Sequence, residues 1–69
     1  MTNLVRAAKS CGLNLRNWSS KDEVVFAVYA AGDCYLGTVA VVDGRLAQPS
    51  AWYKKDAATF YALQAQFVK

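Results

Sequence analysis

Histidine is missing from the 69-residue sequence, and acidic residues are few. Histidine is the side chain that most often transfers protons near neutral pH, so its absence removes the usual general acid or base. Asp33, Asp43 and Asp56 fall at expected turns or at a helix start, and Asp22 and Glu23 would point to opposite faces of a strand. The glycines are too scattered for a phosphate-binding loop. We therefore expect no enzymatic activity and no cofactor.

Cysteine is also scarce, with only Cys11 and Cys34 and no CxxC spacing. Two cysteines do not make a disulfide framework, and a zinc site would need two further ligands from the few carboxylates. We expect two small buried thiols in a reducing compartment and no metal site.

Long hydrophobic runs are absent as well. The longest, residues 24–31, has eight residues, whereas a membrane-spanning helix needs about 20. The first twelve residues carry Arg6 and Lys9 among their apolar positions, which does not fit a secretory signal. We therefore expect a soluble, cytoplasmic protein that does not contact a membrane.

What the chain does have is apolar residues, 55% of the total, with only modest charge. This composition predicts a folded protein, and 69 residues suffice for a single small domain over residues 1–69. The net charge of +3 is dispersed, with only Lys54 and Lys55 adjacent, which is typical of a solvated surface.

Helical periodicity occurs at both ends of the chain. Leu4, Ala7, Ala8 and Cys11 have the spacing of one buried stripe and predict a helix over residues 3–11. The tail changes to the same period and predicts a second helix over residues 56–68.

The region between the helices predicts three strands, over residues 23–31, 34–42 and 45–49. Gly32-Asp33 and Asp43-Gly44 fit two-residue hairpin turns, so the fold class is α+β, a three-stranded antiparallel meander flanked by two helices. Residues 13–18 permit an additional short edge strand, which the pattern does not settle. We expect Trp18 to cover the end of the core, with ligand or base binding as the alternative.

Alternation along the strands sorts the sheet residues onto two faces. The first face is the more apolar and should receive the helices; it contains Val24, Phe26, Val28, Ala30, Tyr35, Gly37, Val39, Val41, Leu46 and Gln48. Gly37 would allow a close approach there or mark a bulge. The second face has almost no polar residue, and it contains Val25, Ala27, Tyr29, Ala31, Cys34, Leu36, Thr38, Ala40, Val42, Arg45 and Ala47.

Two arrangements explain an apolar second face. Either one helix covers each face, or both helices pack on the first face and the second binds a partner. Helices in α+β domains usually gather on one face, which favours the second arrangement. The predicted partner-binding residues are Val25, Tyr29, Leu36 and Val42 with Arg45 at the rim, together with a second segment formed by Trp52, Tyr53, Lys54 and Lys55. The alternative for this segment is that Trp52 caps the core beneath the last helix while Lys54 and Lys55 are solvated.

The predicted function is a non-enzymatic protein–protein interaction module. We expect a small inhibitor or regulator, of a kind that phages and mobile elements often encode, which occupies a surface of a larger host or phage protein and also forms a homodimer. Tyr29, Leu36 and Val42 would anchor the partner, while the basic rim would attract acidic groups. The alternative is a small nucleic-acid-binding protein that uses the sheet face and the basic rim.

Overall fold

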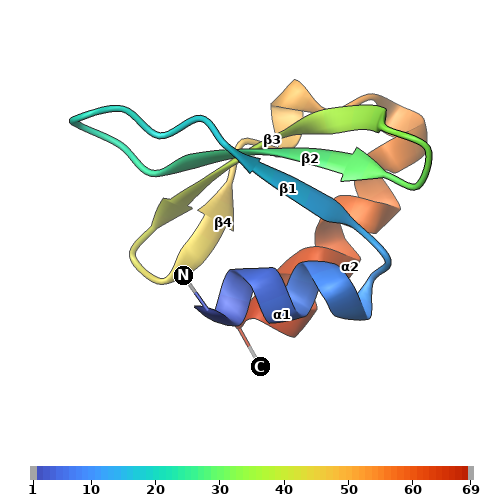
Figure 1. Ribbon diagram of the computed structural model, residues 1–69, viewed down its shortest axis with the longest axis horizontal. Helices are drawn as coiled ribbons and strands as arrows, with labels where there is room; N and C mark the ends of the chain where they lie inside the picture. The colour runs from blue at the N-terminus through green and yellow to red at the C-terminus, as the bar shows by residue number, and fades with distance from the viewer. Residues whose placement is uncertain (1, 69) are drawn as a thin grey trace.

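The computed structural model describes residues 2–68 and confirms the α+β class. The chain forms two helices, four strands and two short 3-10 turns, in the order α1 (Thr2–Ser10), β1 (Asn14–Asn17), β2 (Val25–Ala30), β3 (Cys34–Val42), β4 (Arg45–Ala47), η1 (Pro49–Ala51), η2 (Lys54–Asp56) and α2 (Ala57–Phe67) (Figure 1). The predicted count of three strands is wrong, because the segment after α1 forms a fourth strand, β1. Its sequence signal is weak because three of its four residues are polar.

The four strands form one antiparallel sheet in the order β1-β2-β3-β4, so each strand pairs with its neighbour in the chain. The meander topology is therefore as predicted, with β1 added at one edge. The two edges of the sheet are β1 and β4.

The two hairpins differ in how well the sequence predicts them. Asp43 and Gly44 form the expected two-residue turn, with φ of 51° and 75° at the two positions. The β2–β3 connection is instead a three-residue loop, residues 31–33, because Ala30 pairs with Cys34. The register then shifts by one residue, since Tyr29 pairs with Tyr35 whereas Val28 pairs with Gly37.

This shift leaves Leu36 without a partner on β2 and reverses the alternation of side chains on that part of β3. Tyr35 therefore belongs to the second face and Leu36 to the first, the opposite of the prediction. The bulge lies beside Gly37, one of the two roles that the sequence allowed for this glycine.

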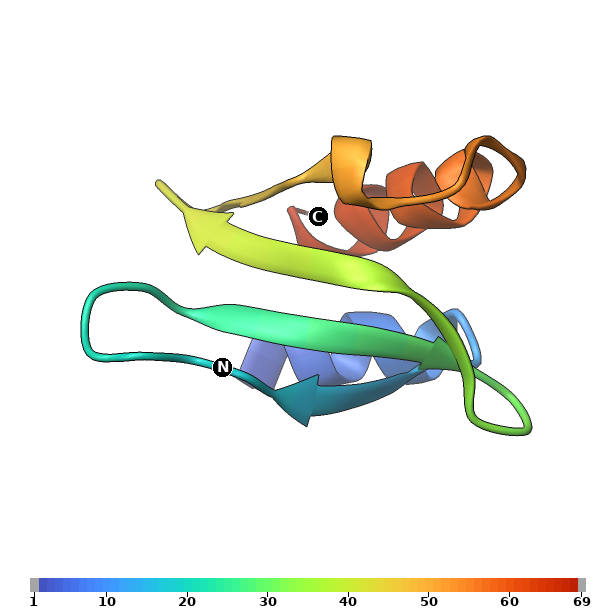
Figure 2. The same ribbon diagram turned by 90° about the horizontal axis from the view of Figure 1, so that it is seen from above.

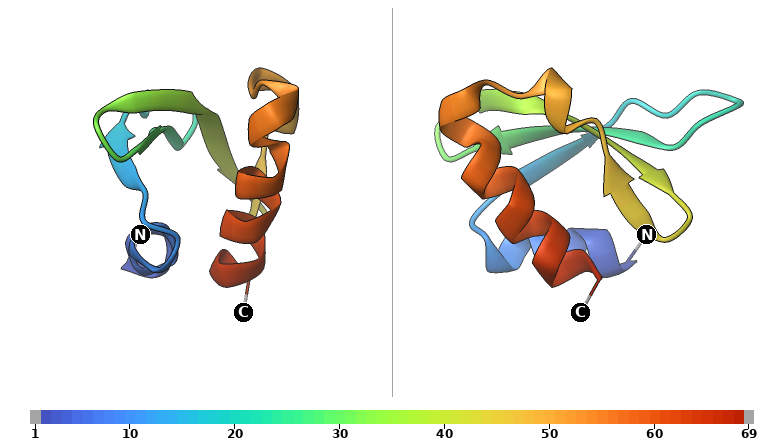
Figure 3. Two further views of the ribbon diagram at one scale, coloured as in Figure 1. Left: turned by 90° about the vertical axis from the view of Figure 1, so that its right-hand side faces the viewer. Right: turned by 180° about the vertical axis from the view of Figure 1, so that it is seen from behind.

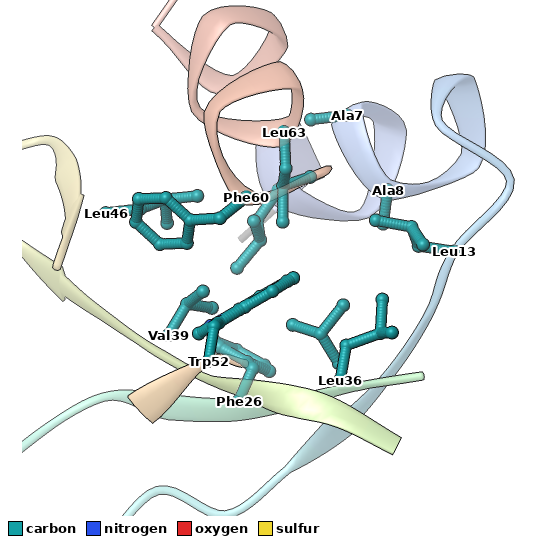
Figure 4. Close-up of a cluster of buried hydrophobic side chains, with 12 residues drawn as sticks. Ala7, Ala8, Leu13, Phe26, Leu36, Val39, Leu46, Trp52, Phe60 and Leu63 are labelled. Carbon is teal, nitrogen blue, oxygen red and sulfur yellow. The ribbon is translucent and has the colours of Figure 1, made fainter. Parts of the chain in front are cut away.

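Both helices pack on the first face of the sheet, which we call the core face (Figure 3). One cluster of buried side chains joins them to the strands and consists of Leu4, Ala7, Ala8, Leu13, Phe26, Val28, Leu36, Val39, Leu46, Trp52, Phe60 and Leu63 (Figure 4). The arrangement is thus two layers, and within residues 2–68 no helix covers the second face, which we call the outer face.

The edge of β4 is closed by a side chain of α2. Gln64 accepts a hydrogen bond from the Leu46 N–H (2.9 Å) and donates one to the Leu46 carbonyl (2.8 Å), as a neighbouring strand would. The N–H and C=O of Leu46 point away from β3, because Leu46 and Val41 form a non-hydrogen-bonded pair between two hydrogen-bonded pairs.

Gln64→Ala is expected to lower the free energy of unfolding by about 2 kcal/mol, because two hydrogen bonds to partly buried backbone groups are lost together. Gln66→Ala is the matched control, since Gln66 is exposed on the same helix, and it should change stability by less than about 0.5 kcal/mol. Urea unfolding measures both values. Equal midpoints for the two variants would contradict the role given to Gln64.

Candidate functional site

The outer face is the side of the sheet that faces away from both helices. The pairing register places on it Asn14, Arg16, Val25, Ala27, Tyr29, Tyr35, Thr38, Ala40, Val42, Arg45 and Ala47. Two of these positions carry arginine and none carries an acid. Ala27 and Ala40 are nevertheless buried, because larger neighbours on the same face surround them.

Three aromatic rings lie together on the outer face, and we call them the aromatic strip: Trp18, Tyr29 and Tyr35. The rings of Trp18 and Tyr35 are stacked, with centroids 6.0 Å apart and 24° between their planes. Tyr29 meets Tyr35 edge to face at 5.4 Å. The Arg16 guanidinium lies 5.2 Å from the centre of the Tyr29 ring, within the range of a cation–π contact.

Two of these rings remain accessible to a partner, with Trp18 exposed to 52% and Tyr35 to 45%. A stack of exposed aromatic rings beside an arginine presents a large, rigid apolar surface together with a fixed positive charge. That combination is typical of the residues that dominate binding energy in protein interfaces.

Short-range hydrogen bonds hold Trp18 in this position just after β1. Its N–H donates to the Val25 carbonyl at 2.9 Å, which continues the β1–β2 ladder. The Ser19 hydroxyl accepts from the Val25 N–H (3.1 Å), and the Asn17 side-chain oxygen accepts from the Ser19 N–H (2.8 Å). The backbone that carries Trp18 is therefore tied to β2 on both sides of the residue.

The β2–β3 bulge places Tyr35 in the strip. Because the register shift turns Tyr35 to the outer face, it lies directly opposite Tyr29 and beside Trp18. Without the shift, Tyr35 would point into the core and Leu36 would take its place on the surface.

The predicted second-face residues divide accordingly. Val25, Tyr29, Val42 and Arg45 do lie on the outer face, the first two half-buried and the last two exposed. Leu36 does not: it is buried among the core side chains and points toward the helices (Figure 4). The assignment of Leu36 to the second face is therefore wrong, because the bulge moves it to the core face.

The second predicted segment is not brought to the aromatic strip. Trp52 is a core residue, buried against Phe60 with ring centroids 5.4 Å apart, and its indole N–H donates to the Thr38 carbonyl at 3.0 Å. The structure therefore places Trp52 in the core, apart from the outer face. Tyr53, Lys54 and Lys55 are exposed, but η1 and η2 lie on the β3 side of the sheet, away from β1 (Figure 2).

Sequence reasoning missed Trp18, Tyr35 and Arg16 as members of this site. Trp18 does not cover the core, yet a signal for this was present: Leu13 and Leu15 share one parity and Trp18 has the other. Treating residues 13–18 as a strand would have placed Trp18 and Arg16 on the outer face. The position of Tyr35 on the outer face depends on the β2–β3 bulge, which the alternation of residues does not indicate.

Other chemistry is sparse among the described residues. Cys34 is exposed at the start of β3 and Cys11 is half-buried, so the prediction of two buried thiols is wrong for Cys34. Within residues 2–68, no group of three or more acidic or cysteine side chains is arranged to hold a metal ion. None of the helices in this range is both long and apolar enough to cross a bilayer.

Comparison with known proteins adds no further identification: no family model matches the chain, and neither a curated protein nor a solved structure does.

Proposed function

We propose that the chain is a non-enzymatic protein–protein interaction module, a small inhibitor or regulator that occupies a surface of a larger protein. The observation that carries the proposal is the stack of Trp18 on Tyr35, exposed on the sheet face opposite to α1 and α2. Trp, Tyr and Arg are the residues most enriched at the centres of protein interfaces. Here all three types meet within one patch, held by the sheet beneath.

The distribution of charge favours a protein partner over a nucleic acid. Among residues 2–68, the pairing register places two basic residues on the outer face, Arg16 and Arg45. Arg6 and Lys9 belong to α1, which packs beneath the opposite face of the sheet. A nucleic-acid platform usually surrounds its stacking rings with several cations that track the backbone phosphates.

Single-stranded nucleic acid is nevertheless the second candidate, because exposed aromatic rings on a sheet can stack on bases. A titration with single-stranded oligothymidylate, followed by the fluorescence of Trp18, separates the two functions. Nucleic-acid binding would quench this fluorescence and weaken steeply as salt is raised. Binding of that kind, lost on Tyr35→Ser with Trp18 kept as the reporter, would favour the second candidate.

The proposal predicts that the double variant Trp18→Ser/Tyr35→Ser loses affinity for the protein partner by about 30-fold or more, because each ring supplies a buried anchor in the complex. The partner is first captured from cells of the encoding organism with the tagged parent protein. It is then purified and its dissociation constant measured for both proteins.

Tyr61→Ser is the matched control, since Tyr61 is exposed to 61% on α2, away from the outer face. It should bind as tightly as the parent, and thermal unfolding should show that all variants are folded. A partner that binds the double variant as tightly as the control would refute a role for the aromatic strip. Sedimentation of the parent at high concentration tests the predicted homodimer, which the strip would also anchor.

A further inference from the structure

The two edges of the sheet differ in how their outward backbone groups are satisfied. At β4, Gln64 occupies the N–H and the carbonyl of Leu46. At β1, the Trp18 N–H donates to the Val25 carbonyl, so these two residues form a hydrogen-bonded pair. Hydrogen-bonded and non-hydrogen-bonded pairs alternate along antiparallel strands, so the backbone N–H and C=O of Leu15 and Asn17 point away from β2. No strand among residues 2–68 pairs with this side of β1, which lies at the border of the sheet (Figures 1 and 2).

A groove runs beside this edge, between α1 and β1. Its volume is about 220 Å³, and it is lined by Val5, Ala8, Lys9, Leu13, Asn14 and Leu15. Leu15 is on the core face of the sheet, so a residue paired opposite it on an added strand would point its side chain to the same side, toward α1. The groove is thus placed to receive one apolar side chain of such a strand.

The charge of the protein is concentrated in the same region. Residues 1–20 contain three basic residues, Arg6, Lys9 and Arg16, and no acid, whereas the five basic and five acidic residues after position 20 cancel. Lys9 lines the groove, and Arg16 lies on β1 between the two residues with outward backbone groups. The entire net charge of +3 therefore belongs to the segment that forms α1 and β1.

We propose that an extended, acidic segment of the partner protein adds to β1 as a fifth strand. It hydrogen-bonds to the backbone of Leu15 and Asn17, inserts an apolar side chain into the groove, and places carboxylates beside Arg16 on the outer face. The inference rests on the proposed function, since it names the mode by which a protein partner is held. A second copy of the chain is a poor occupant, because pairing two β1 strands would bring like charges together.

The test uses a synthetic peptide of about nine residues in which glutamate alternates with valine or threonine. Titrated into the ¹⁵N-labelled protein, it should shift the amide signals of Leu15 and Asn17 and slow their hydrogen exchange at least tenfold. Binding should weaken as salt is raised, and a peptide with lysine in place of glutamate should not bind.

Two changes test the backbone pairing itself. A peptide N-methylated at the amides that face β1 should bind at least tenfold more weakly, and this change cannot affect the folding of the protein. Asn17→Pro removes the outward N–H of an exposed edge residue, where proline is tolerated, and should also weaken binding at least tenfold. Asn17→Ala, which loses the same side chain but keeps the N–H, is the matched reference, so the tenfold loss is measured against this variant.

The inference is overturned if the acidic peptide does not bind at about 1 mM, or if N-methylation leaves its affinity unchanged. It is equally overturned if the shifted signals lie on the aromatic strip instead of β1. The peptide is also titrated into the double variant Trp18→Ser/Tyr35→Ser, which lacks two rings of the aromatic strip but keeps the backbone of β1. Binding to this variant therefore tests strand addition separately from the proposed function. If Asn17→Pro holds the captured partner as well as Asn17→Ala while the double variant does not, strand addition fails and the proposed function stands.

Discussion

Replacing Trp52 with alanine is expected to lower the free energy of unfolding by about 4 kcal/mol. The indole is 7% exposed and packs edge to face on Phe60, and its N–H donates to the Thr38 carbonyl. Removing such a side chain costs the burial of its apolar area and leaves a cavity. A domain of this size has a total stability of only about 3 to 10 kcal/mol, so Trp52→Ala should be largely unfolded at 37 °C.

Tyr53→Ala provides the control for this prediction, because Tyr53 is the next residue and is 68% exposed. It should change stability by less than about 0.5 kcal/mol. Thermal and urea unfolding followed by circular dichroism measure both variants. If Trp52 were instead a partner-binding residue, as the sequence suggests, the two variants would be equally stable, and that outcome would contradict the core position of Trp52.

The second large effect is expected from Gly37→Ala, which should cost about 3 kcal/mol. A Cβ atom at this position would lie 2.6 to 2.8 Å from three atoms of the Trp52 indole. The ring cannot easily move, since it is buried and hydrogen-bonded to the residue next to Gly37. Forcing extra volume into such a contact destabilises a core by shifting side chains from their preferred positions.

The contact predicts a specific coupling between the two residues. In a Trp52→Leu background the shorter side chain leaves room at position 37, so Gly37→Ala should cost at least about 1 kcal/mol less than it does in the parent. Gly44→Ala does not serve as a control, because nothing lies within 4 Å of its Cβ position and its φ of 75° would strain an alanine there for a different reason. Additive costs in the double variant would show that the indole is not what excludes a side chain at Gly37.

Much of the fold follows from local pattern. Both helices, the two long strands and the Asp43-Gly44 turn are predicted to within about two residues, because their periodicity and turn chemistry act over short distances. The placement of both helices on one face also follows from how apolar that face is. The sequence pattern does not settle β1, because a strand of mostly polar residues gains its stability from pairing with β2, which local sequence does not encode.

The site is harder to predict than the fold, and the one-residue register shift between β2 and β3 explains most of the difference. The sequence places Tyr29, Val42 and Arg45 on the correct face by simple alternation. Leu36 and Tyr35 are exchanged, because alternation holds only while the register is unbroken, and the three-residue loop with its bulge is selected by tertiary packing. The packing of Trp52 over Gly37 is a long-range fit that no local window contains.

The bulge in β3 has a consequence for how this surface could change in evolution. The side chain that the protein displays at the centre of the outer face is chosen by the length of the loop over residues 31–33, and not only by the residues of the strand. Shortening that loop by one residue, with the bulge lost, would withdraw Tyr35 and display Leu36 while every strand residue stayed the same. The length of this loop therefore decides which of Tyr35 and Leu36 lies on the outer face and which belongs to the core.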